Sequence, residues 1–402
     1  MGTTHPHVQR RRSVTTIAAA IIAIVALFVP TSGLAGAQAD TGATPPEAAG
    51  SWLADQLVDG ERFETEFDGT IFFDYGLTAD TVVALAAAGV ADGFGASATA
   101  WLGSSSITSG YGGDGSSSAS SGGLAKLAIV AQTRGLDATD WGEDGVDLIQ
   151  RLLDLEDAGG RFVDIPDFGN DFKTFSHAFA IVALARQDGV GPSAESLDLL
   201  LSSQCADGGF SGDLDPAPED CTSGVDSTAT ALFALFAADR PADEDEIDDA
   251  VTFLLDIQAG DGSFSSSDTG ANANSTGLAV YALDLAGEAG AVEDGAQFLR
   301  SLQRGCDAES DQGAIALSAG DFAPGTATRA TAQAMMGLTG TGYVDASAAG
   351  ATTDQPRLDC PDPTATTTST TTTTTAAEPD SSVEPAASPA ATPTRRAPTF
   401  TG

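Results

Sequence analysis

Apolar segments with helical spacing alternate with Gly-rich turns along most of the chain, and the pattern recurs about every 50 residues. In its two clearest copies, residues 204–210 and 258–264, the turn reads Gln-x-x-Asp-Gly-x-Phe. An aromatic residue follows five of the turns, at Phe63, Tyr111, Phe162, Phe210 and Phe264. This period is typical of repeat proteins, in which each unit buries its apolar face against its neighbours.

A second helix is expected after each turn. Leu148, Ile149, Leu152 and Leu155 illustrate the helical spacing in a first helix, and no alternating strand pattern competes with it. The second helices align at Thr78, Leu124, His177, Thr228, Thr276 and Arg329. The sequence therefore predicts an all-α domain of six helix hairpins, which either stack into a rod or close into a ring with one set of helices inside.

The turns 204–210 and 258–264 resemble the Gln-to-Gly-x-Trp repeats of squalene and hopene cyclases and of protein prenyltransferase β subunits. Segments 225–229, Val-Asp-Ser-Thr-Ala, and 274–276, Asn-Ser-Thr, stand where that family opens its inner helices with Asp-Thr-Ala. The resemblance covers roughly residues 48–340 and implies the family's α/α toroid, an α6/α6 barrel. It says much less about chemistry, because fold and activity separate easily.

The two ends of the chain differ from this repeat region. Three arginines, residues 10–12, precede an apolar run at 14–29 and small residues at 35–39, which predicts a signal peptide over 1–39. An uncleaved N-terminal anchor and a twin-arginine export route are the alternatives. Residues 363–402 are rich in Thr and Pro and predict a disordered stalk, which leaves 40–362 for the toroid.

Cysteine usage agrees with export to an oxidising compartment. The chain has four cysteines, for which three disulfide pairings exist, and we expect Cys205 with Cys221 and Cys306 with Cys360. Zinc is the rival interpretation, since prenyltransferase β subunits bind it with an Asp, a Cys and a His. Only His177 follows the predicted signal, and the family's Asp-x-Cys pair is missing, so we expect neither a metal nor a cofactor.

The charge balance excludes some partners. With 17 basic against 57 acidic residues, the formal net charge is −40, which disfavours nucleic acid and anionic lipid surfaces. We expect a secreted or cell-surface protein without a stable membrane span after signal cleavage. Its stalk allows association with a cell wall, and release into the medium is the alternative.

Candidate ligand-binding residues lie where the inner helices begin. In a ring, these N-termini share one mouth and offer unpaired backbone N–H groups with partial positive charge. Ser, Thr, Asn and Asp at such places also cap helices, which is the alternative role for those among them. The candidates are Tyr75, Asp80, Lys173, His177, Asp226, Asn274 and Arg329.

Asp226 is also the candidate catalytic residue. Hopene-type cyclases protonate an alkene with the middle acid of an Asp-x-Asp-Asp-Thr sequence. Segment 224–228 reads Gly-Val-Asp-Ser-Thr, so the resemblance keeps the central acid and loses both acidic neighbours. A carboxylic acid without a polarising partner is a weak proton donor toward an alkene. The chain also lacks an Asp-Asp-x-x-Asp run for magnesium bound to a diphosphate.

Three functions from different classes remain. We expect a binding protein that takes a small apolar or amphipathic ligand in its central cavity without catalysis. The first alternative is a non-catalytic surface scaffold or interaction protein. The second is a terpene cyclase or prenyl-group enzyme that uses Asp226 as its general acid.

Overall fold

The computed structural model describes residues 42–360 except 167–172, 243, 268 and 321. The predicted signal peptide and the predicted stalk, 363–402, lie outside the described residues. The chain divides into two units, residues 1–359 and 360–402, and the architecture below is that of the first. No helix in the described part is long and apolar enough to cross a membrane.

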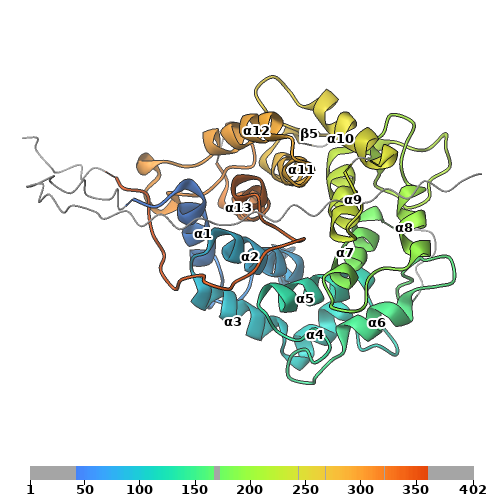
Figure 1. Ribbon diagram of the computed structural model, residues 1–402. Coiled ribbons are helices and arrows are strands. Elements are labelled where there is room, and N and C mark those ends of the chain that lie inside the picture. Colours follow the sequence, from blue (N-terminus) through green and yellow to red (C-terminus); the bar gives the residue numbers. More distant parts are fainter. Residues whose placement is uncertain (1–41, 167–172, 243, 268, 321, 361–402) are drawn as a thin grey trace, which may run out of the picture. The chain divides into compact units, whose positions relative to one another are not determined.

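Helices of the first unit form two concentric layers (Figure 1). Each inner helix contacts the inner helix before and after it, and the last contacts the first, so the ring is closed. The rod is thereby excluded and the predicted toroid is confirmed. The inner helices are α2 (Tyr75–Ala88), α5 (Ser121–Thr133), α7 (Thr174–Ala185), α9 (Val225–Ala237), α11 (Ala273–Ala286) and α13 (Pro324–Thr339).

The outer layer precedes the inner one in every hairpin. Its helices are shorter or more strongly amphipathic, because one face meets solvent. In α6, Leu148, Ile149, Leu152 and Leu155 are buried, whereas Gln150 and Asp154 are exposed. The outer helices are α1 (Pro45–Asp55), α3 (Asp92–Leu102), α4 (Ser105–Gly112), α6 (Leu148–Leu155), α8 (Ala194–Leu201), α10 (Asp245–Ile257) and α12 (Ala289–Ser301), with a 3-10 turn, η1 (Cys306–Asp311), after α12.

Short antiparallel hairpins precede three of the inner helices. They are β1 (Glu64–Phe67) with β2 (Thr70–Phe73), β3 (Phe210–Ser211) with β4 (Ser223–Gly224), and β5 (Ser265–Ser266) with β6 (Gly270–Ala271). Their registers pair Glu64 with Phe73, Phe210 with Gly224, and Ser265 with Ala271. Because each leads into an inner helix, the hairpins lie at the end of the ring where those helices begin, which we call the N-terminal mouth.

The repeated glutamine joins neighbouring hairpins. The Nε2 of Gln258 donates one hydrogen bond to the carbonyl of Gly262 in its own turn, at 3.2 Å, and one to the carbonyl of Ala291 in α12, at 2.9 Å. One amide therefore shapes the turn and attaches the next outer helix. The same two bonds recur for Gln204 with Gly208 (2.9 Å) and Glu246 (2.7 Å), and for Gln303 with Gly313 (3.1 Å) and Pro45 (2.7 Å). Since Pro45 begins α1, the last set closes the ring between its two ends.

The glycine of the turn allows the close approach that these bonds need. Gly262 has a φ of +84°, and a Cβ there would lie 2.1 Å from the carbonyl oxygen of Asp294 in α12. Only glycine fits such a contact. Equivalent contacts below 3 Å join Gly160 to Glu195, Gly208 to Asp249, and Gly313 to Ala48.

The turn is also tied to its own inner helix. The N–H of Phe264 donates to Oγ1 of Thr276 at 2.9 Å, and that hydroxyl donates to the carbonyl of Asn272. The equivalent pairs are Phe210 with Thr228, Phe63 with Thr78, and Ile315 with Thr331. Two details of the predicted alignment are therefore wrong. The sixth unit aligns on Thr331 instead of Arg329, and Tyr111 lies within α4 instead of following a turn.

The segment after α13 crosses the opposite end of the ring. The N–H groups of Ala348 and Thr352 donate to the carbonyls of Thr133 and Gly89, which follow or end α5 and α2. Arg186, after α7, donates to the carbonyls of Tyr343, at 2.5 Å, and Ala346, at 2.8 Å. Residues 340–354 thus span the ends of three inner helices, and in Figure 1 this stretch passes over α2.

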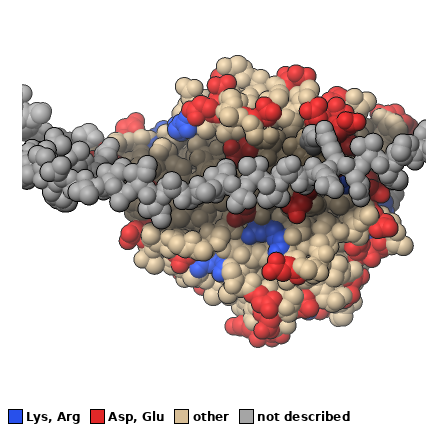
Figure 2. Space-filling model, in the orientation of Figure 1, with Lys and Arg blue, Asp and Glu red and all other residues tan. Residues whose placement is uncertain are grey.

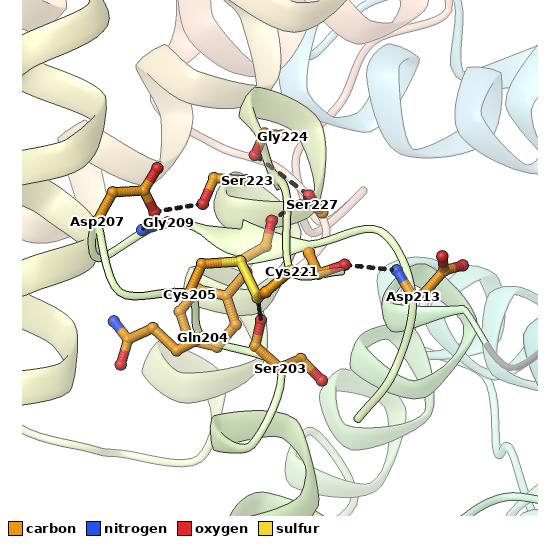
Figure 3. The surroundings of a disulfide bond; sticks show 12 residues. Ser203, Gln204, Cys205, Asp207, Gly209, Asp213, Cys221, Ser223, Gly224 and Ser227 are labelled. Carbon is orange, nitrogen blue, oxygen red and sulfur yellow. Dashed lines mark hydrogen bonds between the residues drawn. A yellow bond between two sulfur atoms is a disulfide. The ribbon is translucent and has the colours of Figure 1, made fainter. Parts of the chain in front are cut away.

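Disulfide bonds hold two further places. The predicted Cys205–Cys221 bond is confirmed, with an S–S distance of 2.03 Å. It connects the turn after α8 to the residues just before β4 (Figure 3). Cys306 and Cys360 are disulfide-bonded as well, so no cysteine in the described part of the chain is free.

The two bonds of the repeated glutamine predict a measurable loss of stability. Gln258→Ala leaves two carbonyl oxygens without their donor and should lower the free energy of unfolding by about 1–3 kcal/mol. Denaturant unfolding followed by circular dichroism measures the change. Gln150→Ala is the control, because exposed Gln150 makes one hydrogen bond, to Asp154, and its loss should cost less than about 0.5 kcal/mol. Equal effects of the two substitutions would contradict the joining role.

Candidate functional site

The structure separates the predicted ligand-binding residues into three groups. Asp80 and Arg329 come together between α2 and α13, and Tyr75 begins α2 beside them in the sequence. Lys173 and His177 lie apart from them at the start of α7, and Asp226 and Asn274 lie at the start of α9 and α11.

Asp80 is the centre of the first group and is only 3% exposed. Its carboxylate pairs with Nζ of Lys126 from α5 and accepts a hydrogen bond from the hydroxyl of Tyr343 at 2.8 Å. Nη1 of Arg329 lies 3.8 Å from the same carboxylate. A buried charge needs such partners, because an unpaired carboxylate inside a protein is costly. Asp80 is therefore engaged in holding the ring together.

Arg329 and Tyr75 extend this group toward the N-terminal mouth. Nη2 of Arg329 donates to the carboxylate of Asp74 at 2.8 Å. The ring of Tyr75 stacks between Trp101 and Tyr111, with centroids 5.9 and 5.3 Å away. Burial first, and then the charges of Asp80 and Asp74, raise the pKa of Tyr111. Both cations of the group already face carboxylates, which weakens the expectation that Arg329 holds an anionic ligand.

Aromatic side chains fill the ring around Tyr343. Tyr343 is 2% exposed, and its ring meets Phe179 and Phe233 at centroid distances of 4.9 and 6.2 Å. Nζ of Lys126 lies 4.9 Å from the centroid of Phe179, a cation–π contact. Burial raises the pKa of Tyr343 well above its ordinary value, so its hydroxyl stays protonated and can donate to Asp80. Aromatic contacts therefore surround Tyr343 inside the ring.

His177 faces the outer layer. Its Nε2 donates to the carbonyl of Ser196 in α8 at 2.8 Å, and its ring packs on Phe162 at 5.2 Å. Desolvation lowers the pKa of His177 to about 4, so the imidazole is neutral near pH 7. His177 occupies the fourth position of its inner helix, as Thr228 and Thr276 do in theirs. The structure therefore gives it the packing role of that position.

Lys173 lies at the rim of the N-terminal mouth. Its Nζ is 2.6 Å from Oδ1 of Asp213, which belongs to the loop between β3 and β4. Both side chains are about half exposed or more, so the pair contributes little to stability.

Figure 2 shows acidic side chains scattered over the visible face with few basic ones among them.

Asp226 borders a groove at the N-terminal mouth with a volume of about 670 Å³. The groove runs between the β3–β4 and β5–β6 hairpins, from α7 to α10. Phe175, Val225, Phe253 and Ile257 supply its apolar surface. Its other lining residues are Gly212, Thr222, Ser223, Gly224, Ser227, Ser265, Ser266 and Ser267.

Local structure holds one wall of this groove. The Cys205–Cys221 bond fixes the strand that continues through Thr222 to Gly224 (Figure 3). Oγ of Ser223 donates to Asp207 at 2.5 Å, and Oγ of Ser227 donates to the carbonyl of Phe210 at 2.7 Å. These bonds fasten the wall to the repeat turn, so Asp226 is presented from a rigid support.

Asp226 has an unusual environment for an acid. Its Oδ1 is buried and has no hydrogen-bond partner among the described residues. Desolvation raises the pKa of Asp226, and a hydrogen bond with Ser275 opposes that shift in part. The amide oxygen of Asn274 is likewise buried without a partner in the described part. The site can thus offer a carboxylic acid O–H or accept a donor from a bound molecule.

Sequence reasoning missed Phe253 and Ile257 as site residues. Both lie on the outer helix α10, whose buried face is formed by Ile247, Ala250, Val251 and Leu254. Ile257 is 40% exposed. Apolar residues off the buried face of an amphipathic helix are the signal that could have found them. The described residues contain no group of three or more His, Cys, Asp and Glu side chains placed to hold a metal ion.

Comparisons with known proteins identify the fold. The chain is similar to the type II terpene cyclase MstE from Scytonema, with a TM-score of 0.53 and 17% identity over 73% of this chain and 96% of that one. A variant of MstE in complex with its substrate, geranylgeranyl dihydroxybenzoate, matches with a TM-score of 0.53, 16% identity and coverage of 74% and 95%. A structure described as a wild-type glycosidase matches with a TM-score of 0.50, 12% identity and coverage of 74% and 96%. No protein-family model and no curated protein sequence matches. The ring therefore has a terpenoid cyclase-like α/α toroid fold.

The raised pKa of Asp226 predicts a pH-dependent stability difference. Its ordinary pKa is 3.8, so below that value both the folded and unfolded chains hold the proton. As the pH rises, the unfolded chain loses the proton first and the wild type loses stability relative to Asp226→Asn, which cannot ionise. Denaturant unfolding from about pH 3 to pH 7 should show Asp226→Asn gaining on the wild type. Asp188→Asn, at an exposed turn, is the control and should show no such trend. A flat difference for Asp226→Asn would contradict its buried environment.

The lowered pKa of His177 predicts the opposite trend. An NMR titration should give a pKa of about 4 instead of 6.5 for the ring, assigned by its absence in His177→Gln. Between these values the unfolded chain binds a proton that the folded chain excludes, so the wild type loses stability as the pH falls. The total is on the order of 3 kcal/mol, and His177→Gln should lack it. A His177 pKa near 6.5 would show that the ring is not held neutral.

Proposed function

We propose that this protein is a non-catalytic binding protein that takes a small amphipathic ligand in the groove at its N-terminal mouth. The observation that carries the proposal is the combination of an apolar surface from Phe175, Phe253 and Ile257 with one buried acid, Asp226. The volume of about 670 Å³ suits a drug-sized molecule, since ligand pockets usually measure roughly 300–1,000 Å³. The apolar part of the ligand lies on the aromatic rings, and its polar group bonds to Asp226.

The surroundings of Asp226 favour binding over catalysis. Gly224 has no side chain, and the hydroxyl of Ser227 donates to the carbonyls of Phe210 and Gly224. Neither neighbour polarises the acid, and Oδ1 lacks a partner in the described residues. A carboxylic acid in this setting protonates an alkene poorly, although it makes a good hydrogen-bond partner for a ligand.

The related fold supports the class of ligand. MstE, which is similar to this chain in fold, binds geranylgeranyl dihydroxybenzoate. That molecule carries a prenyl chain and an aromatic carboxylate with two hydroxyl groups. We propose a ligand of the same general build, with an apolar chain and a polar head. Disulfides and the predicted signal peptide support a secreted or cell-surface protein, where such a carrier meets its ligand outside the cell.

A cyclase that uses Asp226 as general acid is the second candidate. The raised pKa of Asp226 favours it, because an acid catalyst must hold its proton near the working pH. It differs from the first candidate in one respect that can be measured, the conversion of a polyprenyl substrate.

Binding to the groove can be tested with N-phenyl-1-naphthylamine, a neutral apolar fluorescent probe. Ile257→Asp places a charge on the apolar surface at a residue that is 40% exposed, so the ring should still fold. We expect its affinity for the probe to fall at least tenfold, about 1.4 kcal/mol, because the charge must be desolvated or displaced. Asp188→Asn changes a charge away from the groove and should bind the probe as the wild type does.

Two results would overturn the proposal. Unchanged probe binding by Ile257→Asp would place the ligand elsewhere. Incubation with geranylgeranyl dihydroxybenzoate, followed by chromatography and mass spectrometry, tests the cyclase. Conversion to a product of equal mass and different retention, absent in Asp226→Asn, would establish catalysis.

A further inference from the structure

A second pocket lies on the outer side of the ring, beside α12. It has a volume of about 700 Å³ and shares no lining residue with the groove at the N-terminal mouth. The turn after α10 and the segment after η1 complete its walls. Among its lining residues are Asp261, Asp294, Gln297, Ser301, Arg304 and Phe322.

Arg304 differs from most arginines in the described part of the chain. Its Nε is buried and has no hydrogen-bond partner in the described residues. Eight other arginines in that part donate to a carboxylate or a carbonyl: Arg62, Arg134, Arg151, Arg186, Arg240, Arg300, Arg329 and Arg357. The guanidinium of Arg304 makes neither kind of hydrogen bond within the described residues.

The position of Arg304 is set by aromatic packing. The guanidinium lies over the ring of Phe322, 5.3 Å from its centroid, and Trp52 packs on Phe322 edge to face at 6.4 Å. Stacking uses the face of the guanidinium and leaves the N–H donors in its plane for other partners. A bound group that accepts from Arg304 would give the guanidinium the hydrogen-bond partner that it lacks among the described residues.

The remaining groups in the pocket restrict what that partner is. Asp261 accepts hydrogen bonds from the N–H and Oγ of Ser263, which lower its pKa and keep it ionised. Asp261 and Asp294 therefore repel a ligand with several negative charges. Carboxylates, the amide of Gln297 and the hydroxyl of Ser301 are good partners for hydroxyl groups. One anionic group and several hydroxyls satisfy this set of side chains.

We propose that this pocket binds a hydroxylated monocarboxylate, the chemistry of a sugar acid, with its carboxylate on Arg304 and its hydroxyls on the acidic and amide side chains. The fork of a guanidinium matches a carboxylate with two parallel hydrogen bonds, and the charge makes these bonds stronger than neutral ones. This site is independent of the amphipathic ligand proposed for the groove.

Isothermal titration calorimetry of the full chain with D-glucuronate tests the proposal. We expect saturable binding to the wild type and at least tenfold weaker binding to Arg304→Gln, which keeps a planar group and loses the charge. Arg300→Gln is the matched control. Arg300 lies in the last turn of α12, four residues before Arg304, pairs with Glu293 and does not line the pocket, so glucuronate should bind this variant as it binds the wild type. Ile257→Asp should also leave glucuronate binding unchanged, which separates this site from the groove.

Two further probes use only the wild-type protein and so decide the question even if Arg304→Gln fails to fold. D-Glucose lacks the carboxylate and should bind at least tenfold more weakly than glucuronate. Inorganic phosphate lacks the hydroxylated ring and should also bind at least tenfold more weakly. Absence of glucuronate binding, equal binding of glucose, or equal binding of phosphate would each overturn the proposal.

Discussion

The ring depends on one side-chain amide that is used repeatedly. Each repeat glutamine donates to the carbonyl of its own turn and to a carbonyl in the first turn of the next outer helix, and Gln303 does so across the junction between the last and first hairpins. The glycine of the turn makes this reach possible, because a Cβ at Gly262 or Gly313 would collide with the backbone of the helix being joined. The Gln-x-x-Asp-Gly-x-Phe pattern is therefore a device for attaching neighbours, and it carries no chemistry of its own.

This physical role explains which features the sequence could predict. The repeat encodes contacts that are local to a turn and its two helices, so the six hairpins and the Cys205–Cys221 bond were visible in the chain. The predicted alignment failed in the sixth unit, where the contact between turn and inner helix is kept but the sequence pattern is not. In the sixth unit Ile315 substitutes for the aromatic residue and Thr331 lies one turn further into its helix, so the alignment on Arg329 was off by two residues. Periodicity also says nothing about Tyr343, whose place inside the ring depends on Asp80, 263 residues away.

The candidate site lies at the rim of the ring instead of around Asp80. Lys126 and Tyr343 both bond to Oδ1 of Asp80 inside the ring, and the segment that carries Tyr343 lies across the ends of the inner helices. The predicted site residues also lie apart, because side chains near the start of a helix can point to different sides of it. Asp226 points to a groove at the mouth, whereas His177, in the next hairpin back, points outward to α8. Sequence position alone could place both at helix starts, and it could not choose between those faces.

Asp226 shows why the fold alone does not decide the chemistry of the site. Solved structures similar to this chain include a terpene cyclase and a glycosidase, so the ring by itself selects no reaction. What differs locally is the residue after the acid. The hydroxyl of Ser227 donates to the carbonyl of Phe210, the aromatic residue of the repeat turn, and thereby ties α9 to that turn. The proton of that hydroxyl is therefore not donated to the carboxyl group of Asp226. The interaction that ties α9 to the repeat turn at this point is therefore also the one that directs the hydroxyl next to Asp226 away from its carboxyl group.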